Sequence, residues 1–335
     1  MKKTLMTLSL ALALAACNSE SPAPTPTAEP AASATPAAPA TPAAPVDMWT
    51  RYDTVAAGAQ RSDANKARDQ YRHPKETLQF FGLGNGMNVV EITPGGGWYT
   101  ELLAPLLKGN GTLTLGIFDP AKIADQGTKD YNTRNNDKLK AKLGGDADSY
   151  GEVRFVEMDP AAPKLGADGS ADMVLTFRNV HNWTQDGNDA AMFKAFFDVL
   201  KPGGILGVEE HRANPGTDAK TSAETGYLTE DYVVGLATGA GFELVEKSEI
   251  NANPKDTKDH EKGVWTLPPT LALGDKDKDK YLAIGESDRM TIKFRKPGGD
   301  AAATPAPSGS DSAKGFEASG TPAAETPAPT AAPGG

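Results

Sequence analysis

The sequence predicts an α/β fold: a doubly wound, mostly parallel sheet with helices on both faces. Three observations lead to this prediction. From residue 87 onward, short apolar runs alternate with stretches of helical periodicity, the pattern of strands joined by crossover helices. A run of three glycines follows the first apolar run. Between two Pro- and Ala-rich ends lie residues 46–297, which is enough chain for one large domain with a sizeable core.

Seven apolar runs have the length and composition of strands. In chain order they are Asn88–Ile92, Thr112–Ile117, Val153–Glu157, Asp172–Phe177, Ile205–Glu210, Phe242–Glu249 and Arg289–Lys296. Four stretches between them have helical periodicity, namely Trp98–Leu107, Tyr131–Leu143, Ala190–Leu200 and Glu230–Ala240. Two further helices, Asp63–Tyr71 and Pro74–Phe81, are predicted ahead of the first strand, the second because proline favours a helix start.

The last two strands have no clear helix between them, which predicts an antiparallel pair at the end of the domain. The segment that separates them, Asn251–Asp288, is an insertion rich in Pro, Lys and Asp. Within it we expect His260 to face solvent. The alternating charges of residues 275–280 predict a solvated loop, because the lysines oppose the binding of a cation such as calcium.

The N-terminus has the pattern of an export signal. Lys2 and Lys3 precede an apolar run, Leu5–Ala16, that is too short to cross a bilayer but fits a signal-peptide core. The run ends at Cys17 after small residues, and this end resembles a bacterial lipobox. The resemblance implies that residues 1–17 hold the signal peptide and the lipobox, and that Cys17 becomes lipidated. An ordinary signal peptide with an incidental cysteine is the alternative. Asn18 favours the periplasmic face of the outer membrane, so we expect a cell-envelope lipoprotein.

Two segments have too few large apolar side chains to offset the entropy of ordering them. Residues 18–45, rich in Pro and Ala, predict a disordered tether, which could extend roughly 80–90 Å at the rise of a proline-rich chain. Residues 298–335 have a similar Pro-, Ala- and Gly-rich composition and predict a disordered tail. The folded domain is therefore expected to span residues 46–297.

Charge and cysteine content exclude several classes of function. The chain holds 34 Lys and Arg residues against 44 Asp and Glu, a net charge of −10. Such an acidic chain, without a basic block, argues against nucleic acid as a partner. A single cysteine rules out a disulfide framework and a cysteine-rich metal site. The His and Glu spacings match no metal site that we recognise, so no metal is expected.

The strongest motif is the stretch from Val89 to Glu101, in which a strand ends in an acid, a glycine-rich turn follows and a helix begins. Glycines allow positive φ angles and let a ligand approach the backbone closely. The dinucleotide pattern G-x-G-x-x-G fails because Thr100 stands at its third glycine, which makes a nicotinamide oxidoreductase a weak candidate. A structural turn without a ligand is the other alternative.

The same stretch resembles the first motif of the class I S-adenosylmethionine (SAM) methyltransferases, acid-x-G-x-G-x-G. Glu91, Gly95 and Gly97 match that motif, and Thr93 stands where its first glycine would be. The resemblance implies that these four residues and Gly96 bind SAM as the cofactor.

Further segments extend the resemblance over roughly residues 70–297. Residues 153–159 resemble the third-strand motif, which implies that Met158 and Asp159 contact the adenine. Gly169–Val174 and Leu200–Leu206 resemble the entries to the fourth and fifth strands. Residues 177–180 are similar to a segment of quinone-biosynthesis methyltransferases, which implies cofactor contacts for Arg178 and Asn179. Tyr71–Pro74 is similar to a segment in a group of predicted methyltransferases. The implied fold is a Rossmann-like class I methyltransferase sheet in the order 3-2-1-4-5-7-6.

One position departs from the family pattern. In the family, an acid at the end of the second strand binds the ribose hydroxyls, and the usual spacing from Glu91 puts Ile117 there. An apolar residue would lose a charge-assisted hydrogen bond of about 1.5–3 kcal/mol. Asp119, two residues later, is the nearest acid and the expected substitute.

Other candidates could act on the substrate. His181 follows the fourth strand and His211 ends the fifth, at the rim where such sheets bind ligands, so either could be the catalytic base. His73 and Trp183 are candidates for substrate contact. A structural role is the alternative for each of these residues.

The sequence as a whole favours a membrane-anchored, SAM-dependent methyltransferase that acts on a small molecule. The alternative is a degenerate methyltransferase-fold protein that binds a periplasmic ligand without catalysis. Ile117 and the export of the domain away from cytosolic SAM both favour that alternative.

Overall fold

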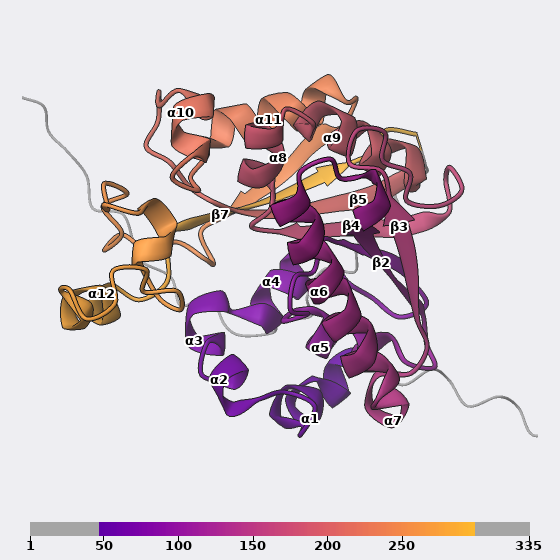
Figure 1. Ribbon diagram of the computed structural model, residues 1–335. Coiled ribbons are helices and arrows are strands. Elements are labelled where there is room, and N and C mark those ends of the chain that lie inside the picture. The colour runs from indigo at the N-terminus through magenta and orange to yellow at the C-terminus, as the bar shows by residue number, and fades with distance from the viewer. Residues whose placement is uncertain (1–46, 299–335) are drawn as a thin grey trace, which may run out of the picture. The chain divides into compact units, whose positions relative to one another are not determined.

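The computed structural model describes residues 47–298. They contain a seven-stranded sheet in the order β3-β2-β1-β4-β5-β7-β6, which confirms the predicted order (Figure 1). The strands are β1 (Asn88–Ile92), β2 (Thr112–Phe118), β3 (Val153–Met158), β4 (Ala171–Phe177), β5 (Leu200–His211), β6 (Glu243–Ser248) and β7 (Arg289–Arg295). The expected bounds agree with these closely, except that β5 begins five residues earlier than predicted.

Strands β1 to β5 pair in parallel, and β7 pairs antiparallel with both β5 and β6. The predicted antiparallel end of the sheet is therefore confirmed. All the parallel strands end at one edge of the sheet, so the segments that follow β1, β2 and β4 lie close together.

The helices occupy the gaps that the sequence predicted and add several short turns. They are η1 (Met48–Arg51), α1 (Tyr52–Ala57), α2 (Asp63–Lys66), α3 (Asp69–Arg72), α4 (Pro74–Phe81), α5 (Thr100–Leu107), η2 (Pro120–Lys122), α6 (Gln126–Gly144), α7 (Ala147–Tyr150), α8 (Val180–Asp186), α9 (Asp189–Val199), α10 (Ala219–Ala223), α11 (Glu230–Gly239), η3 (Gly263–Thr266) and α12 (Lys278–Ile284).

Two helices differ from their predicted form. The single helix expected over Asp63–Tyr71 is divided into α2 and α3, and the break precedes Asp69, which pairs with Arg61. The long helix α6 begins at Gln126, five residues before the expected start. Its N-cap is Asp125, whose side chain accepts a hydrogen bond from Thr128 N, a preferred way to begin a helix.

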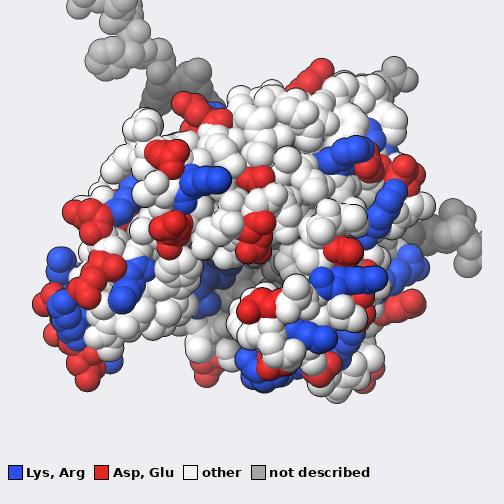
Figure 2. Space-filling model, turned by 45° about the horizontal axis from the view of Figure 1, so that its top comes forward, with Lys and Arg blue, Asp and Glu red and all other residues white. Residues whose placement is uncertain are grey.

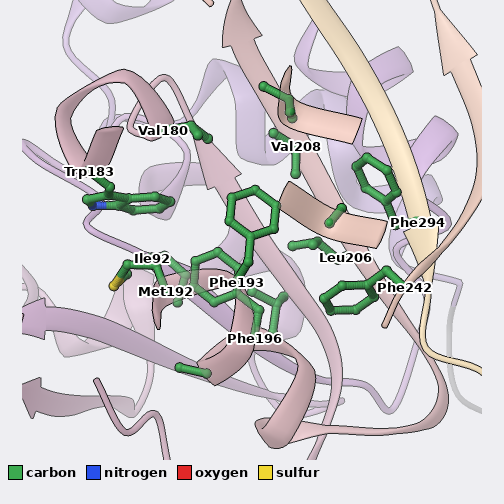
Figure 3. Close-up of a cluster of buried hydrophobic side chains, with 14 of the residues drawn as sticks. Ile92, Val180, Trp183, Met192, Phe193, Phe196, Leu206, Val208, Phe242 and Phe294 are labelled. Atoms are coloured by element: carbon green, nitrogen blue, oxygen red, sulfur yellow. The ribbon is translucent and has the colours of Figure 1, made fainter. Parts of the chain in front are cut away.

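Each face of the sheet buries its own apolar cluster, because successive strand side chains point to opposite faces. Val90 faces the cluster under α8, α9, α10 and α11, whereas its neighbour Val89 faces the cluster under η1, α1, α4, α5, α6 and α7. In the first cluster, drawn in Figure 3, Phe193 and Phe196 of α9 pack with Leu206 of β5. The predicted helices on both faces are thereby confirmed (Figure 1).

The insertion between β6 and β7 departs from expectation at one residue. His260 was expected in solvent, but its side chain is 4 % exposed and its Nε2 lies 2.9 Å from Asp256 Oδ1. The prediction was wrong because the buried carboxylate that holds the ring does not show in the local sequence pattern. The alternating charges of residues 275–280 are exposed, although the last three form the first turn of α12.

On the face drawn in Figure 2, acidic and basic side chains are interspersed. None of the helices within residues 47–298 is both long and apolar enough to cross a membrane. Cys17, the tether and the tail lie outside the described residues, so the predictions made for them stay predictions.

Candidate functional site

A cavity of about 720 Å³ opens at the carboxyl edge of the sheet. It lies against Thr93, Pro94 and Gly95 after β1 and against Ile117 and Phe118 at the end of β2, and side chains of α6 and α8 form its walls. This volume is within the usual range for small-molecule sites, and open α/β sheets bind their ligands at this edge.

The glycine-rich turn supplies part of the cavity lining. Gly95 lines the cavity with φ of +58°, and a Cβ built there would meet nothing within 4 Å. Gly97 also has a positive φ, +78°, but its Cβ would stand 2.8 Å from Leu139 Cδ1 of α6. Gly96 and Gly97 are not among the lining residues. Gly95 therefore leaves open space beside the cavity, whereas Gly97 permits close packing of α6.

Thr93 has a strained backbone at the cavity wall. Its φ of 42° lies in the left-handed region, which is rare for a β-branched residue and costs of order 1–3 kcal/mol. Its Oγ1 is buried and has no hydrogen-bond partner among the described residues, and an unpaired buried polar group in a native structure needs an explanation. A ligand that hydrogen-bonds to this hydroxyl is one such explanation.

The Glu91 side chain connects β1 to α5, the two elements on either side of the glycine-rich turn. Its side chain is buried and accepts a hydrogen bond of 2.6 Å from Thr100 Oγ1, at the start of α5. Burial raises the pKa of Glu91 to about 7, against the opposing effects of Thr100 and Arg178. Glu91 is not among the cavity-lining residues, so its predicted cofactor contact stays a prediction.

Near the end of β2, the acids lie differently from the expectation. The apolar Ile117, at the position where the family has an acid, lines the cavity. The carboxylate of Asp119 accepts from Ala121 N at 2.8 Å, and Asp119 is not among the lining residues. Asp125, which the sequence analysis missed, does line the cavity, and hydrogen bonds from Thr128 lower its pKa. Its position directly before a long helix, where aspartate often caps the helix, is the sequence signal that could have identified it.

The segment after β3 adds little to the cavity. Met158 is buried in the core, and the Asp159 carboxylate accepts from Ala161 N at 2.9 Å. Only the next residue, Pro160, lines the cavity. The adenine contacts that the resemblance implied for Met158 and Asp159 therefore stay predictions.

Asn179 and Trp183 both line the cavity. The Asn179 amide donates to Ile92 O at 3.1 Å and so ties the segment after β4 to the end of β1. Trp183 is 1 % exposed and packs edge-on against Phe196. The amide side chains of α6 and α8 were also missed in the sequence; those that line the cavity are Asn132, Asn135, Asn136, Asn182 and Gln185.

The two candidate bases lie together at the ends of β4 and β5. Their rings are 5.5 Å apart, but neither residue is among those that line the cavity. His181 Nδ1 lies 3.0 Å from Glu210 Oε1, and His211 Nδ1 lies 2.5 Å from Ser287 Oγ. Burial lowers the pKa of His211 well below its usual value, and His181 and Arg178 lower it further. His211 is therefore neutral at pH 7.

The group formed by His181, Glu210 and His211 resembles a set of metal ligands, with ligand atoms within 4.8 Å of one another. Three backbone N–H groups already donate to the Glu210 carboxylate, from Val180, His181 and His211, in addition to the contact with His181 Nδ1. Little acceptor capacity is left on that carboxylate for an ion. The expectation that no metal binds stays a prediction.

His73 and Arg178 have left-handed backbones, with φ of 38° and 60°. His73 stands between α3 and α4, and its Nδ1 is 3.4 Å from Asn251 Oδ1. Arg178 follows β4, and its Nη1 donates to Glu209 Oε1 at 2.8 Å. Neither residue is among those lining the cavity, so their predicted ligand contacts stay predictions.

The comparisons with known proteins concern the fold. No protein-family model matches the chain, and no curated protein matches it in sequence. Similar solved structures include a SAM-dependent methyltransferase from Aquifex aeolicus, 14 % identical with a TM-score of 0.45, which covers 68 % of this chain and 92 % of that one.

A putative methyltransferase from Bacillus halodurans C-125 is 18 % identical with a TM-score of 0.44, covering 68 % and 99 % of the two chains. The [4+2]-cyclase SpnF is 17 % identical with a TM-score of 0.50, covering 72 % and 86 %. At these identities the likeness concerns the fold alone. The strand order β3-β2-β1-β4-β5-β7-β6, with β7 antiparallel to its neighbours, is that of the class I methyltransferase fold.

Proposed function

We propose that the chain is a SAM-dependent methyltransferase that acts on a small molecule. The observation that carries the proposal is the cavity beside the glycine turn. There the Thr93 hydroxyl has no partner within residues 47–298, and the open space at Gly95 gives a ligand room to approach the backbone. Both features fit a bound cofactor at the carboxyl edge of the sheet.

In this proposal, different residues of the cavity bind different parts of SAM. The turn at Thr93 and Gly95 would hold one part of the cofactor, and Asp125 is the carboxylate available for the ribose hydroxyls at the β2 end. When bound, SAM supplies a methyl group on a sulfonium. The protein needs mainly to position the lone pair of the acceptor, because orientation supplies much of the rate enhancement in such a displacement.

His211 and His181 do not line the cavity, so they would take up a proton only from an acceptor that extends past the cavity to the ends of β4 and β5. Burial lowers the pKa of His211, so its imidazole is neutral at pH 7 with a free lone pair, but it is a weaker base than an ordinary histidine. The contact with the Glu210 carboxylate holds the His181 ring in one orientation.

A second candidate is a binding protein or degenerate enzyme on the same fold. Ile117 favours it, because this apolar side chain lines the cavity at the position where the family has an acid. One fold can carry several chemistries, and the [4+2]-cyclase has a similar structure.

Calorimetry of the full chain in detergent, with SAM and with S-adenosylhomocysteine, tests the proposal. We expect saturable binding of both, with one ligand per chain. The lack of any binding at millimolar ligand would overturn the methyltransferase proposal and leave the binding-protein candidate.

We also propose that the chain is a lipoprotein, lipidated at Cys17 and held at the periplasmic face of the outer membrane, with a small-molecule substrate and no nucleic-acid partner. The support is the apolar run that ends at Cys17. Cys17→Ser should lose the lipid label and leave the detergent phase. A labelled, membrane-bound variant would contradict the proposal.

A further inference from the structure

Four arginines and two glutamates form a buried cluster next to the histidine pair. The arginines come from α3 and its N-terminal edge, from the segment after β4 and from β7; the glutamates come from β5 and from the residues before β7. We call this group the arginine cluster; its members are Arg68, Arg72, Arg178, Arg289, Glu209 and Glu286.

Ion pairs connect all six members of the arginine cluster. Glu286 pairs with Arg68 at 2.6 Å and with Arg72 at 2.9 Å. Arg289 pairs with Glu286 at 2.8 Å and with Glu209 at 3.0 Å. Tyr99 donates a further hydrogen bond, of 2.9 Å, to Glu209. Arg178 pairs with Glu209 at 2.8 Å, so each of the two carboxylates contacts three partners.

The cluster holds more positive than negative charge in a place shielded from water. Four guanidinium groups face two carboxylates, and the side chains of Arg72 and Arg289 are 5 % and 1 % exposed. Burial, and then the neighbouring Arg178, lower the pKa of Arg72 to about 9. Burial also opposes the charge of Arg178, but Glu209 and other neighbouring groups together outweigh it and raise the pKa of Arg178. The incompletely compensated charge is therefore that of Arg72, where an additional anion is favoured because such a buried charge is costly.

Arg72 has donors left for such an anion. Only its Nε is bonded, to Glu286, and its guanidinium lies over the Trp98 ring at 4.6 Å. Among the described residues, neither of its Nη atoms has a hydrogen-bond partner, and 5 % of the side chain remains exposed. In the described part of the chain the Arg178 guanidinium bonds only through Nη1, and 16 % of its side chain is exposed.

The cluster adjoins the candidate site. Arg178 directly precedes Asn179, which lines the cavity. Arg289 stands opposite His211 in the pairing of β7 with β5, and Arg178 N donates to Glu209 O of β5 at 2.7 Å. The unpaired donors thus lie near the candidate base at the carboxyl rim of β4 and β5.

We propose that the arginine cluster binds the anionic group, a carboxylate or a phosphate, of the small molecule that this protein methylates. The identity of that ligand as the substrate rests on the proposed function, whereas the existence of the anion site does not. Guanidinium groups suit both anions, because their planar donors match carboxylate and phosphate oxygens.

Calorimetry of the full chain with inorganic phosphate and, separately, with malonate tests the proposal in a chloride buffer of low ionic strength. We expect saturable binding of at least one of them, and the tighter of the two identifies the kind of anion. Arg72→Gln should weaken that binding about tenfold or more, through the loss of charge-assisted hydrogen bonds.

Arg61→Gln is the matched control. Arg61 is also a buried arginine over the Trp98 ring, at 5.1 Å, but it faces its own carboxylates, Asp69 and Glu101. Its replacement should leave anion affinity within about threefold. Arg178→Lys is a second variant that keeps the charge; it should weaken binding through loss of the fork geometry, and it tests the cluster if Arg72→Gln does not fold.

If neither phosphate nor malonate binds at millimolar concentration, the anion site is overturned. An equal loss of affinity in the Arg61 and Arg72 variants overturns it as well. The same samples are titrated with S-adenosylhomocysteine. Anion binding without any binding of this compound overturns the proposed function and leaves the anion site. Binding of the compound without anion binding overturns the anion site alone.

Discussion

Thr100 Oγ1 donates a hydrogen bond of 2.6 Å to Glu91, which fixes the end of β1 to the first residue of α5. The carboxylate is 2 % exposed, and burial raises its pKa from 4.5 to about 7. The folded state therefore holds this proton to higher pH than the unfolded state does.

The raised pKa of Glu91 predicts a pH-dependent stability. The contribution of Glu91 to the free energy of unfolding is complete below about pH 4.5 and is lost as the pH rises through 7. The reason is that the folded state binds more protons than the unfolded state between these pH values. Glu91→Gln removes the titration and keeps an oxygen that can accept from Thr100. The stability of this variant relative to wild type should rise by about 3 kcal/mol between pH 4.5 and 8.

Urea unfolding at several pH values measures this difference. Groups such as His211, which titrate in both proteins, cancel in the comparison. A difference in unfolding free energy that stays constant with pH would contradict a raised pKa for Glu91.

Thr93→Gly should stabilise the domain. Glycine relieves the left-handed strain at φ 42° and removes the unpaired hydroxyl, which together outweigh the extra freedom of glycine in the unfolded chain. We expect a gain of about 1–2 kcal/mol in the free energy of unfolding.

Thr93→Val is the control, because it removes the hydroxyl but keeps the β-branched strain. Its gain in a denaturant titration should be smaller than that of the glycine variant. A glycine variant less stable than wild type would show that the backbone strain at Thr93 is not real.

Gly95 and Gly96 should respond differently to alanine. Gly95 lines the cavity at φ +58°, whereas Gly96 does not line it, and an added Cβ meets nothing at either position. Gly95→Ala should cost about 1–2 kcal/mol in stability and lower the affinity for S-adenosylhomocysteine about tenfold or more, since the methyl group occupies ligand space. Gly96→Ala is the control for both. Calorimetry beside thermal unfolding separates the two effects, and equal affinities in the two variants would remove Gly95 from the site.

Much of the fold was predictable because its signals are local. The bounds of Asn88–Ile92 and Pro74–Phe81 match their predictions at both ends, since an apolar run and a leading proline are each visible in one short stretch. The arginine cluster was not predictable in this way. Arg68 and Glu286 are 218 residues apart in sequence, and no pattern along the chain shows that they meet. The candidate site was predictable in part, because glycine turns are local signals whereas the orientation of an acid is not.

Substitution of Asp125 tests which of the two acids near the end of β2 binds the ligand. Both Asp125 and Asp119, the acid expected from the sequence, accept a hydrogen bond from a backbone N–H, but only Asp125 lines the cavity. Asp125→Asn should keep the helix, because asparagine is an equally good N-cap. It should lower the affinity for S-adenosylhomocysteine about tenfold, because a hydrogen bond to a neutral amide is weaker than one to a carboxylate.

Asp119→Asn is the matched control for Asp125→Asn, and calorimetry should find its affinity within about threefold of wild type. The reverse result would mean that Asp119 turns toward the ribose when the ligand binds. If wild type binds S-adenosylhomocysteine and neither variant changes its affinity, no carboxylate at the β2 end holds the ribose. The apolar side chain of Ile117 would then mark a real departure from family chemistry at this end of the cavity.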